Sequence, residues 1–297
     1  MNKIKIFFSL LFTLSLTFTF SFSSIFRNDS VLDNEEENSE IVVVPDDNNN
    51  VIVPDDNTGD NTVIVPDNND QDNNTPEEVD FTKMTVNCLG DSLTFGSLPS
   101  GARMEYPYPE LLKQELGFAT VRNFGVGGTK VANEGITSFC CRYTVLPDAD
   151  IVIVMGGTND SLSLSPNNTA PRTPLGTPDD TIDTTFYGAL DNLCRGLIAK
   201  YPDAFIMFVT PLPIADSVDA WTQACGSFSI EDGCEAVKVV CGRYNIPVFD
   251  AYNETGYDEI SNAEASSGIG DGIHPNQEFW ATDFAPKLAQ FIVDNYE

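Results

Sequence analysis

The sequence predicts an α/β domain in which a parallel sheet lies between layers of helices. Two observations carry this prediction. From Met84 onward, short apolar runs alternate with segments whose apolar residues recur at helical spacing. The run 149–157 (ADIVIVMGG) is also apolar throughout, as expected for a strand buried on both faces. Strand–helix alternation of this kind is typical of a parallel sheet with helices on both sides.

The expected elements follow one another in a regular order. Strands are predicted at 84–90, 120–125, 149–157, 204–211 and 246–251. Helices are predicted at 109–117 (ended by Gly117), at 185–202, at 235–245 and at the C-terminus. The 185–202 helix repeats apolar residues at helical spacing, namely Phe186, Leu190, Leu193, Leu197 and Ile198. The C-terminal helix is expected to bury Phe279, Trp280, Phe284, Leu288, Phe291 and Ile292.

The first 23 residues have the pattern of a secretory signal peptide. Lys3 and Lys5 form a basic start, and no charged residue follows until Arg27. Cleavage is expected after Ser23, with an uncleaved N-terminal signal anchor as the alternative. The pattern predicts a secreted or cell-surface protein with no stable membrane insertion after cleavage.

Residues 24–80 are expected to form a disordered acidic stalk. Residues 28–80 contain seventeen Asp and Glu and no Lys or Arg, and VVVPDDNNN, VIVPDDNTG and VIVPDNNDQ are imperfect copies of one unit. Such a composition buries too little apolar surface to offset chain entropy. Calcium binding is disfavoured, because the acidic runs lack the Gly and Glu positions of an EF-hand loop. Residues 81–297 remain as one folded domain.

The charge of the chain argues against nucleic acid as a partner. The formal net charge is −30. Residues 28–80 contribute −17 and the three basic residues before them +3, so residues 81–297 keep −16. A domain this acidic should repel nucleic acid and anionic membrane surfaces. The oligomeric state is left open.

The seven cysteines are interpreted in the light of the expected export. Cys88 lies in an apolar run and is expected to be a buried free thiol, and Cys194 is expected in the core. Cys225 and Cys234 flank a Gly-containing loop and are the best candidates for a disulfide. Because no C-x-x-C pair exists and the chain has one histidine, no metal site is expected.

Polar residues and glycines follow the predicted strands. Ser92 lies in GDSLTFG after the first strand, where a tight turn would expose its hydroxyl; an ordinary helix N-cap is the alternative. The glycines of NFGVGGTK follow the second strand and can present a bare N–H. Asn159 in GGTND follows the third; its amide can donate to a developing oxyanion, or it is simply a turn residue. The carboxyl ends of parallel strands share one edge, where ligands bind.

The only histidine lies in DGIHPN, after the last strand. Asp271 and His274 are three residues apart, so they can share one face of a turn. An aspartate can fix the tautomer of an imidazole and stabilise its protonated form. His274 is therefore a candidate proton carrier.

Together these blocks resemble the SGNH hydrolase superfamily, the GDSL-type esterases and lipases. GDS with Ser92, N-x-G-x-x-G over 123–128, G-x-N-D with Asn159 and D-x-x-H with His274 occur in family order over residues 84–296. PLGTPDDTIDTTFYGAL and FVTPLP resemble a subgroup of small bacterial members. The resemblance implies a flavodoxin-like three-layer α/β/α sandwich with a five-stranded parallel sheet, and residues 81–297 as the catalytic domain.

The resemblance also implies roles for single residues. Ser92 would be the nucleophile, His274 the general base and then acid, and Asp271 the residue that orients His274. The oxyanion hole would consist of the Ser92 and Gly128 backbone N–H groups and the Asn159 amide. No cofactor and no metal are implied.

Further residues are candidates for substrate binding. The segments 161–180 and 213–233 follow the third and fourth strands and are expected to build the pocket. Trp221 and Phe228 could stack on a sugar, or instead pack their loop against the domain. Asp91 and Asp160, next to the catalytic blocks, are also candidates.

The sequence therefore predicts a secreted serine esterase that works through an acyl-enzyme. Its expected substrates are small-molecule or glycan esters, with short acyl groups, above all acetyl, on carbohydrate. One alternative is a lipase, lysophospholipase or thioesterase for longer acyl chains. The other is a non-catalytic glycan-binding surface module.

Overall fold

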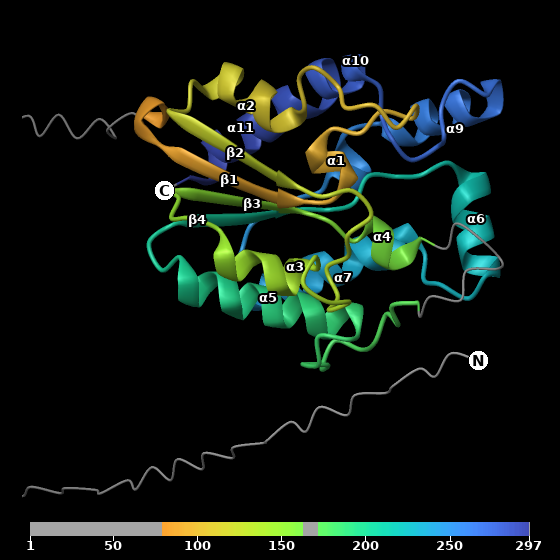
Figure 1. Ribbon diagram of the computed structural model, residues 1–297, viewed down its shortest axis with the longest axis horizontal. Helices are drawn as coiled ribbons and strands as arrows, with labels where there is room; N and C mark the ends of the chain where they lie inside the picture. The colour runs from red at the N-terminus through yellow and green to blue at the C-terminus, as the bar shows by residue number, and fades with distance from the viewer. Residues whose placement is uncertain (1–78, 163–171, 297) are drawn as a thin grey trace, which may run out of the picture. The chain divides into compact units, whose positions relative to one another are not determined.

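A five-stranded parallel sheet forms the centre of the part of the chain that the structure describes. The computed structural model describes residues 79–162 and 172–296, so the expected signal peptide and nearly all of the expected stalk lie outside the described residues. The strands are β1(Thr85–Gly90), β2(Thr120–Gly125), β3(Ile151–Met155), β4(Phe205–Val209) and β5(Val248–Phe249). They lie in the order β2-β1-β3-β4-β5 (Figure 1). This is the flavodoxin-like order, and it confirms the predicted fold class.

The strand register brings the carboxyl ends into one row. Gly90 of β1 pairs with Gly125 of β2 and with Met155 of β3. Met155 pairs in turn with Val209 of β4. The residues that follow these strands therefore all emerge at the same edge of the sheet.

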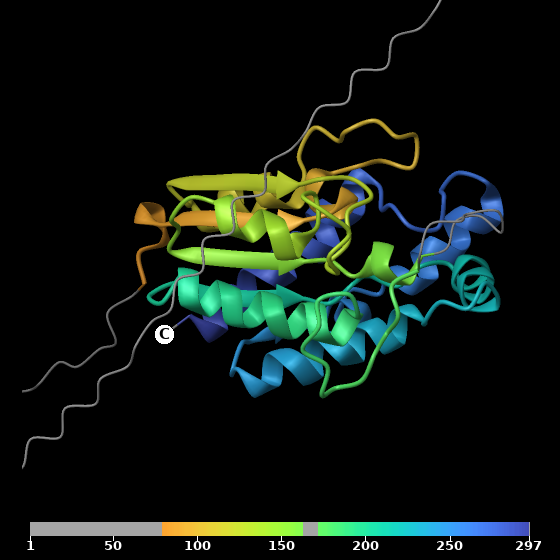
Figure 2. The same ribbon diagram turned by 60° about the horizontal axis from the view of Figure 1, so that its bottom comes forward.

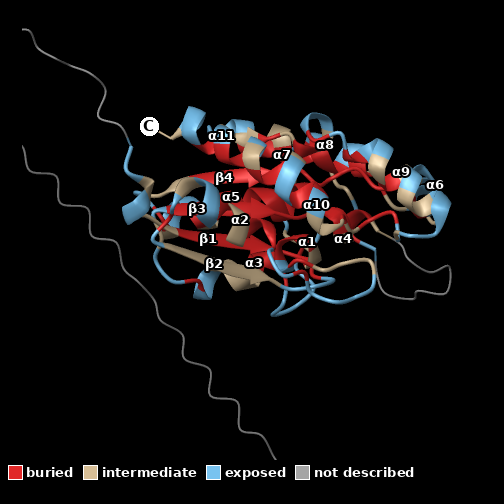
Figure 3. Ribbon diagram, turned by 90° about the horizontal axis from the view of Figure 1, so that it is seen from above, coloured by how far each residue is buried: buried red, intermediate tan, exposed pale blue. Residues whose placement is uncertain are grey.

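Helices cover both faces of the sheet. One face carries α2(Tyr108–Leu116), α10(Gln277–Phe279), the π-helix η3(Trp280–Phe284) and α11(Ala285–Asn295) (Figure 1). The other face carries α3(Phe139–Arg142), α5(Phe186–Lys200) and α7(Ile230–Arg243) (Figure 2). Each helical layer packs its own apolar cluster against the sheet, and the buried residues concentrate there (Figure 3). Strand β3 is buried at every position, as its apolar run predicts, whereas the edge strand β2 is half-buried throughout.

Two predicted helices differ from the structure for local reasons, and the predicted end of a third agrees with it. Helix α7 begins at Ile230, before the predicted start at 235, because Ser229 and Asp232 form a capping box there. Helix α2 ends before Gly117, which has φ 72° and donates its N–H to the Lys113 carbonyl, as predicted. The C-terminal helix is not continuous, since it passes through the π-helix just before Pro286.

Short elements at the edges were not predicted. They are η1(Phe81–Lys83), α1(Ser92–Phe95), α3, η2(Tyr143–Val145), α4(Thr158–Ser161), α6(Asp216–Ala224), α8(Ala251–Glu254) and α9(Tyr257–Ser267). Most of them are only one or two turns long, too short for a periodic pattern to be visible in the sequence. None of the helices in the described residues is long and apolar enough to cross a membrane.

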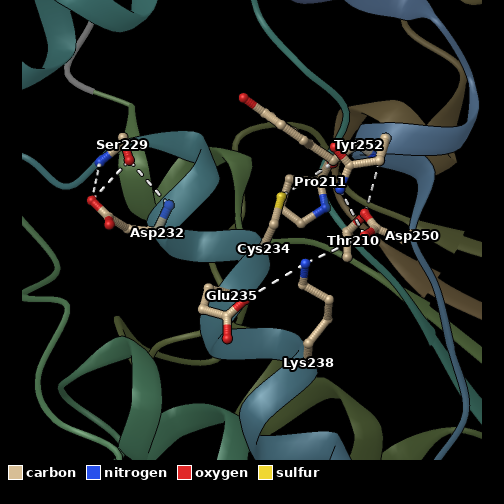
Figure 4. A network of polar contacts seen from close by, with 10 residues as sticks. Thr210, Pro211, Ser229, Asp232, Cys234, Glu235, Lys238, Asp250 and Tyr252 are labelled. Atoms are coloured by element: carbon tan, nitrogen blue, oxygen red, sulfur yellow. Dashed lines mark hydrogen bonds and ion pairs between the residues drawn. The ribbon is translucent and has the colours of Figure 1, made fainter.

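The expected disulfide between Cys225 and Cys234 is wrong in this structure. Both cysteines are free. Cys234 is buried, and its thiol lies 3.6 Å from the Pro211 carbonyl oxygen that it faces in Figure 4. Burial raises the pKa of this thiol far above its usual range, so it stays protonated. Cys88 and Cys194 are buried free thiols, as predicted.

Candidate active site

The turn between β1 and α1 presents the Ser92 hydroxyl. Asp91, not Ser92, is the N-cap of α1, and its carboxylate accepts the Leu93 N–H at 2.9 Å. Ser92 is thus the first helical residue, and capping does not engage its hydroxyl. The Ser92 Oγ lies 2.9 Å from the His274 Nε2. The alternative interpretation of Ser92 as an ordinary N-cap does not hold.

His274 connects Ser92 to Asp271. Its Nδ1 lies 2.7 Å from Asp271 Oδ2, while Asp271 Oδ1 accepts the backbone N–H groups of Ile273 and His274 at 2.9 and 2.8 Å. Burial alone would raise the pKa of Asp271, but the hydrogen bond from the His274 side chain and those from the backbone together lower it to about 2. The carboxylate is therefore ionised and can only accept, so Nδ1 carries a proton, and in the neutral imidazole Nε2 faces Ser92 as an acceptor.

The loop that carries His274 is held from two sides. The Gly272 carbonyl accepts the Ala215 N–H at 2.8 Å, which ties the loop to the segment after β4. Asn276 donates its amide to Glu264 Oε1 of α9 at 2.8 Å and caps α10 by accepting the Phe279 N–H. The histidine is thus placed on a fixed turn although it lies 182 residues from Ser92 in the chain.

Two backbone N–H groups are open at the site. Gly128 has φ 74°, a conformation that a glycine adopts readily, and a Cβ built there would meet no atom within 4 Å. Within the described part of the chain, the N–H groups of Gly128 and Ser92 donate to no acceptor. Both residues line the same cavity beside His274. These N–H groups are therefore free to bind an oxygen of a ligand.

Asn159 lies at the site, but its amide has partners already. The Asn159 Nδ2 donates to Asp91 Oδ2 at 3.2 Å and to the Thr129 carbonyl at 3.1 Å. Its two hydrogens are thus used in the ligand-free arrangement. A bond from Asn159 to an oxyanion requires that one of these contacts be shared or exchanged.

Asp91 and Asp160 are not substrate-facing, which corrects the prediction for both. Asp91 is fully buried, and its carboxyl oxygens accept hydrogen bonds from the Leu93 N–H and the Asn159 side-chain amide. Asp160 is 1% exposed and accepts the N–H groups of Val131 and Ala132 at 2.9 and 3.0 Å. Burial raises the pKa of Asp91 to about 6 and that of Asp160 to about 7, against the effect of these backbone donors. Both carboxyl groups support the loops of the site from behind.

The two predicted aromatic contacts are not at the cavity either. Phe228 is buried and stacks on Phe186 of α5, with ring centroids 5.2 Å apart, so it packs its loop against the core. Trp221 on α6 is 46% exposed, but it does not line the cavity beside Ser92. The segment 213–233 therefore supplies no lining residue there. The segment 161–180 supplies Leu162 to the lining of the cavity, and its residues 163–171 lie outside the described residues.

The cavity beside Ser92 measures about 260 Å³. Its apolar lining comes from Leu98, Pro99, Leu162 and Ile273, and of these Leu162 lies in a segment that was predicted to build the pocket. Leu98 and Pro99 belong to a hairpin closed by bonds from Leu98 N–H to Ala102 and from Met104 N–H to Gly96. The signal that could have found this hairpin is the turn sequence LPSG directly after the Ser92 block.

The described residues contain no group of three His, Cys, Asp or Glu side chains placed to hold a metal ion. The titratable groups that converge at the cavity are those of His274 and Asp271. The His274–Asp271 pair can activate the Ser92 hydroxyl. The open N–H donors can bind a negatively charged oxygen.

The chain resembles known proteins in sequence and in structure. The model of the GDSL-like lipase/acylhydrolase family matches residues 88–279, more than half of the chain. A solved structure of a protein from Lactobacillus plantarum has 25% identity and a TM-score of 0.60, covering 74% of this chain and 100% of that one. No curated protein is significantly similar in sequence.

Two further solved structures show the same fold. One is described as a possible lipase from Chitinophaga pinensis; it has 21% identity and a TM-score of 0.53, covering 71% of this chain and 98% of that one. The other is an aryl esterase from M. smegmatis with 24% identity and a TM-score of 0.50, covering 71% of this chain and 98% of that one.

Proposed function

Because the chain belongs to the GDSL-like lipase/acylhydrolase family and is a carboxylic-ester hydrolase, we propose that Ser92, His274 and Asp271 carry its reaction. The observation that supports this most is the continuous contact from Asp271 through His274 to Ser92, with distances of 2.7 and 2.9 Å. The proposed reaction is hydrolysis through an acyl-enzyme on Ser92, and its preferred substrates are short acyl esters of neutral alcohols.

The proton transfers follow from the tautomer of His274. Nε2 accepts the Ser92 proton while Oγ attacks the ester carbonyl, and the imidazolium is stabilised by the ionised Asp271. When the tetrahedral intermediate collapses, the carbon–oxygen bond to the alcohol breaks and Nε2 returns the proton to the leaving alkoxide. Water then enters, gives its proton to Nε2 and attacks the acyl-enzyme, and Ser92 leaves with that proton.

Three groups are proposed to hold the oxyanion. The N–H groups of Ser92 and Gly128 have no other acceptor among the described residues. The Asn159 amide is the third, and it must share one of its two present contacts with the oxyanion. Loss of one such donor costs roughly 10²–10³ in kcat in other serine hydrolases.

Changing Asp271 to Asn is expected to lower kcat by on the order of 10³- to 10⁴-fold. The amide oxygen of the new asparagine should still accept the backbone N–H groups of Ile273 and His274, so its NH₂ group would face His274 Nδ1. Nδ1 would then lose its proton and Nε2 would carry one, which prevents it from accepting the Ser92 proton. Kinetics on p-nitrophenyl acetate measure the effect, and a variant within tenfold of wild type would contradict this role.

Short acyl groups are supported by the size and lining of the cavity. Its volume of about 260 Å³ lies below the range of about 300–1,000 Å³ that is usual for pockets of drug-sized ligands. Leu98, Pro99 and Ile273 line it, so it suits a small apolar group such as acetyl. The alternative is a lipase, lysophospholipase or thioesterase that takes long chains.

A neutral alcohol such as a carbohydrate is supported by charge. The net charge of −16 on residues 81–297 disfavours the binding of substrates with anionic head groups and of acidic esters. The signal-peptide pattern of residues 1–23 supports action at the cell surface or outside the cell, where acetylated polysaccharides are found. We propose acetylated carbohydrate as the substrate class on these grounds.

We expect kcat/KM to fall steadily along the p-nitrophenyl series from acetate through butyrate and octanoate to palmitate. Longer chains cannot be fully buried in the cavity, so they add little binding energy. Leu98→Ala should widen the cavity and raise the butyrate-to-acetate ratio severalfold, whereas Ile182→Ala, at an exposed residue outside the cavity, should leave it unchanged.

A screen of acetylated xylan, acetylated cellobiose and O-acetylated peptidoglycan tests which alcohol carries the acyl group, with chitin oligomers as a control because their acetyl groups are amides. Acetate release from one of the carbohydrates, lost in a Ser92→Ala protein, supports the proposal. Faster turnover of palmitate esters or of a lysophospholipid than of acetate esters would favour the long-chain alternative.

A further inference from the structure

Arg142 makes an unusual set of contacts behind the site. It is the last residue of α3 and is half-buried. Its Nη1 donates to the Phe124 carbonyl at 2.6 Å, and its Nη2 donates to the Gly90 carbonyl at 2.8 Å. These carbonyls belong to the carboxyl ends of β2 and β1. The guanidinium therefore joins the two strands at the edge where the site lies.

The same guanidinium also holds the loop after β2. Its Nη2 donates to Thr129 Oγ1 at 3.0 Å and its Nε to the Thr137 carbonyl at 2.7 Å. The ring of Phe139 lies beside the cation, with 5.0 Å from the guanidinium carbon to the ring centroid. One side chain thus binds four acceptors on three separate segments of backbone.

Two of these acceptors, Gly90 and Thr129, lie close in the chain to a proposed oxyanion donor. Gly90 lies two residues before Ser92, and Thr129 directly follows Gly128. The Thr129 carbonyl accepts the Asn159 amide at 3.1 Å. A shift of Arg142 would therefore change the relative positions of all three donors.

We propose that Arg142 is a positioning residue, which holds the Ser92, Gly128 and Asn159 donors in the arrangement that an oxyanion requires. The inference rests on the proposed function of these donors. Arg142 does not line the cavity, so it acts through the backbone that it binds. The positive charge also lies near the buried Asp91 carboxylate, which interacts favourably with it.

The chemistry of the side chain explains why an arginine is needed. A guanidinium presents planar N–H donors in a rigid fork, and here Nε, Nη1 and Nη2 all have acceptors. A lysine would keep the charge but supply one compact ammonium group that cannot reach all four acceptors. Arg142→Lys consequently separates the effect of geometry from that of charge.

We expect Arg142→Lys to lower kcat by about 10- to 100-fold and to leave KM within about twofold. The oxyanion exists only in the transition state and intermediates, so misplaced donors affect kcat more than substrate binding. Binding of a boronic acid, which forms a tetrahedral adduct with the serine, should weaken by a similar factor. A purely structural role would lower the thermal unfolding temperature without this selective change.

Arg122 offers a matched control. It is a half-buried arginine on β2 whose Nη1 bonds Asn87 Oδ1 at 3.2 Å and the Asp148 carbonyl at 3.1 Å, away from the site edge. Arg122→Lys should lower the unfolding temperature while kcat remains within twofold of wild type. Equal losses of kcat in the two Lys variants would overturn the proposal, because they would indicate general destabilisation.

Chemical rescue provides a second readout. In Arg142→Ala, guanidinium chloride at low, non-denaturing concentration should restore part of the lost kcat, and the same salt should not help Arg122→Ala. If Arg142→Lys retains the wild-type kcat and the activity still requires Ser92, this inference is overturned while the proposed function stands. Activity that survives Ser92→Ala removes the proposed function itself, so the two failures are distinguishable.

Discussion

Replacement of Ser92 by alanine is expected to lower kcat on p-nitrophenyl acetate by on the order of 10⁶-fold, the loss that removal of a serine nucleophile causes elsewhere. Among the described residues, the Ser92 hydroxyl is the one hydrogen-bond partner of His274 Nε2, at 2.9 Å. Ser97 and Thr158 also line the cavity, but in the described part of the chain neither hydroxyl bonds His274. Steady-state kinetics on protein purified free of host esterases measure the loss.

Ser267→Ala is the control for this variant, because Ser267 is an exposed serine on α9 that bonds only the Glu264 carbonyl. Its kcat should equal that of wild type. The Ser92→Ala protein should also fail to react with a fluorophosphonate that labels the wild type. Retention of a tenth of the activity in Ser92→Ala would remove this serine from the mechanism.

Replacement of His274 by alanine is expected to cause a loss of similar size, on the order of 10⁶-fold in kcat. The chain has no second histidine, so no other imidazole can accept the Ser92 proton. Asp271 lies on the far side of the ring and does not contact Ser92 itself. Millimolar imidazole added to His274→Ala should restore a small, concentration-dependent rate.

The folding of His274→Ala can be checked independently of activity. The loop of His274 is held by the Gly272 carbonyl and by Asn276, neither of which uses the imidazole. Its unfolding temperature should therefore stay close to that of wild type. Substantial activity without added imidazole would show that a different base serves Ser92.

Much of the sheet and the core of the site could be predicted from the sequence. The strands are short, apolar and separated by helical periodicity, and the carboxyl ends of parallel strands must share one edge. Ser92, Asn159 and the Asp271–His274 pair all follow strands, so they meet at the row defined by Gly90, Gly125 and Met155.

The support of the site could not be predicted in the same way. Asp160 was expected to face substrate, but it binds the N–H groups of Val131 and Ala132, which lie 29 and 28 residues away. The sequence shows a carboxylate beside a catalytic block and not the direction in which it points. Arg142 likewise acts through carbonyl groups, which every residue has and which leave no signal in the sequence.

Loop packing is the second part that pattern reasoning missed. Phe228 and Trp221 lie in a segment at the right edge of the sheet, yet Phe228 stacks on Phe186 and Trp221 lies apart from the cavity. The hairpin of Leu98 and Pro99 lines the cavity instead. Which of several loops reaches the site depends on their folded paths, and composition does not determine these paths.

The central claim, that His274 is the base for Ser92, can be tested by comparing two titrations. The acid limb of the kcat/KM profile reports the essential group of the free enzyme. Asp271, with its pKa lowered to about 2, cannot account for a limb near neutrality, whereas burial places the pKa of Asp91 at about 6 and that of Asp160 at about 7. A near-neutral limb could thus arise from a buried carboxyl group as well as from the imidazole.

The deciding measurement is an NMR titration of the imidazole in ¹⁵N-labelled protein without a histidine tag, because the single signal must belong to His274. Its midpoint should coincide with the acid limb of kcat/KM recorded in the same buffers, and the Nε2 shift of the neutral form should be that of an unprotonated nitrogen. A midpoint displaced from the limb by about one pH unit or more would contradict the claim and assign the limb to another group.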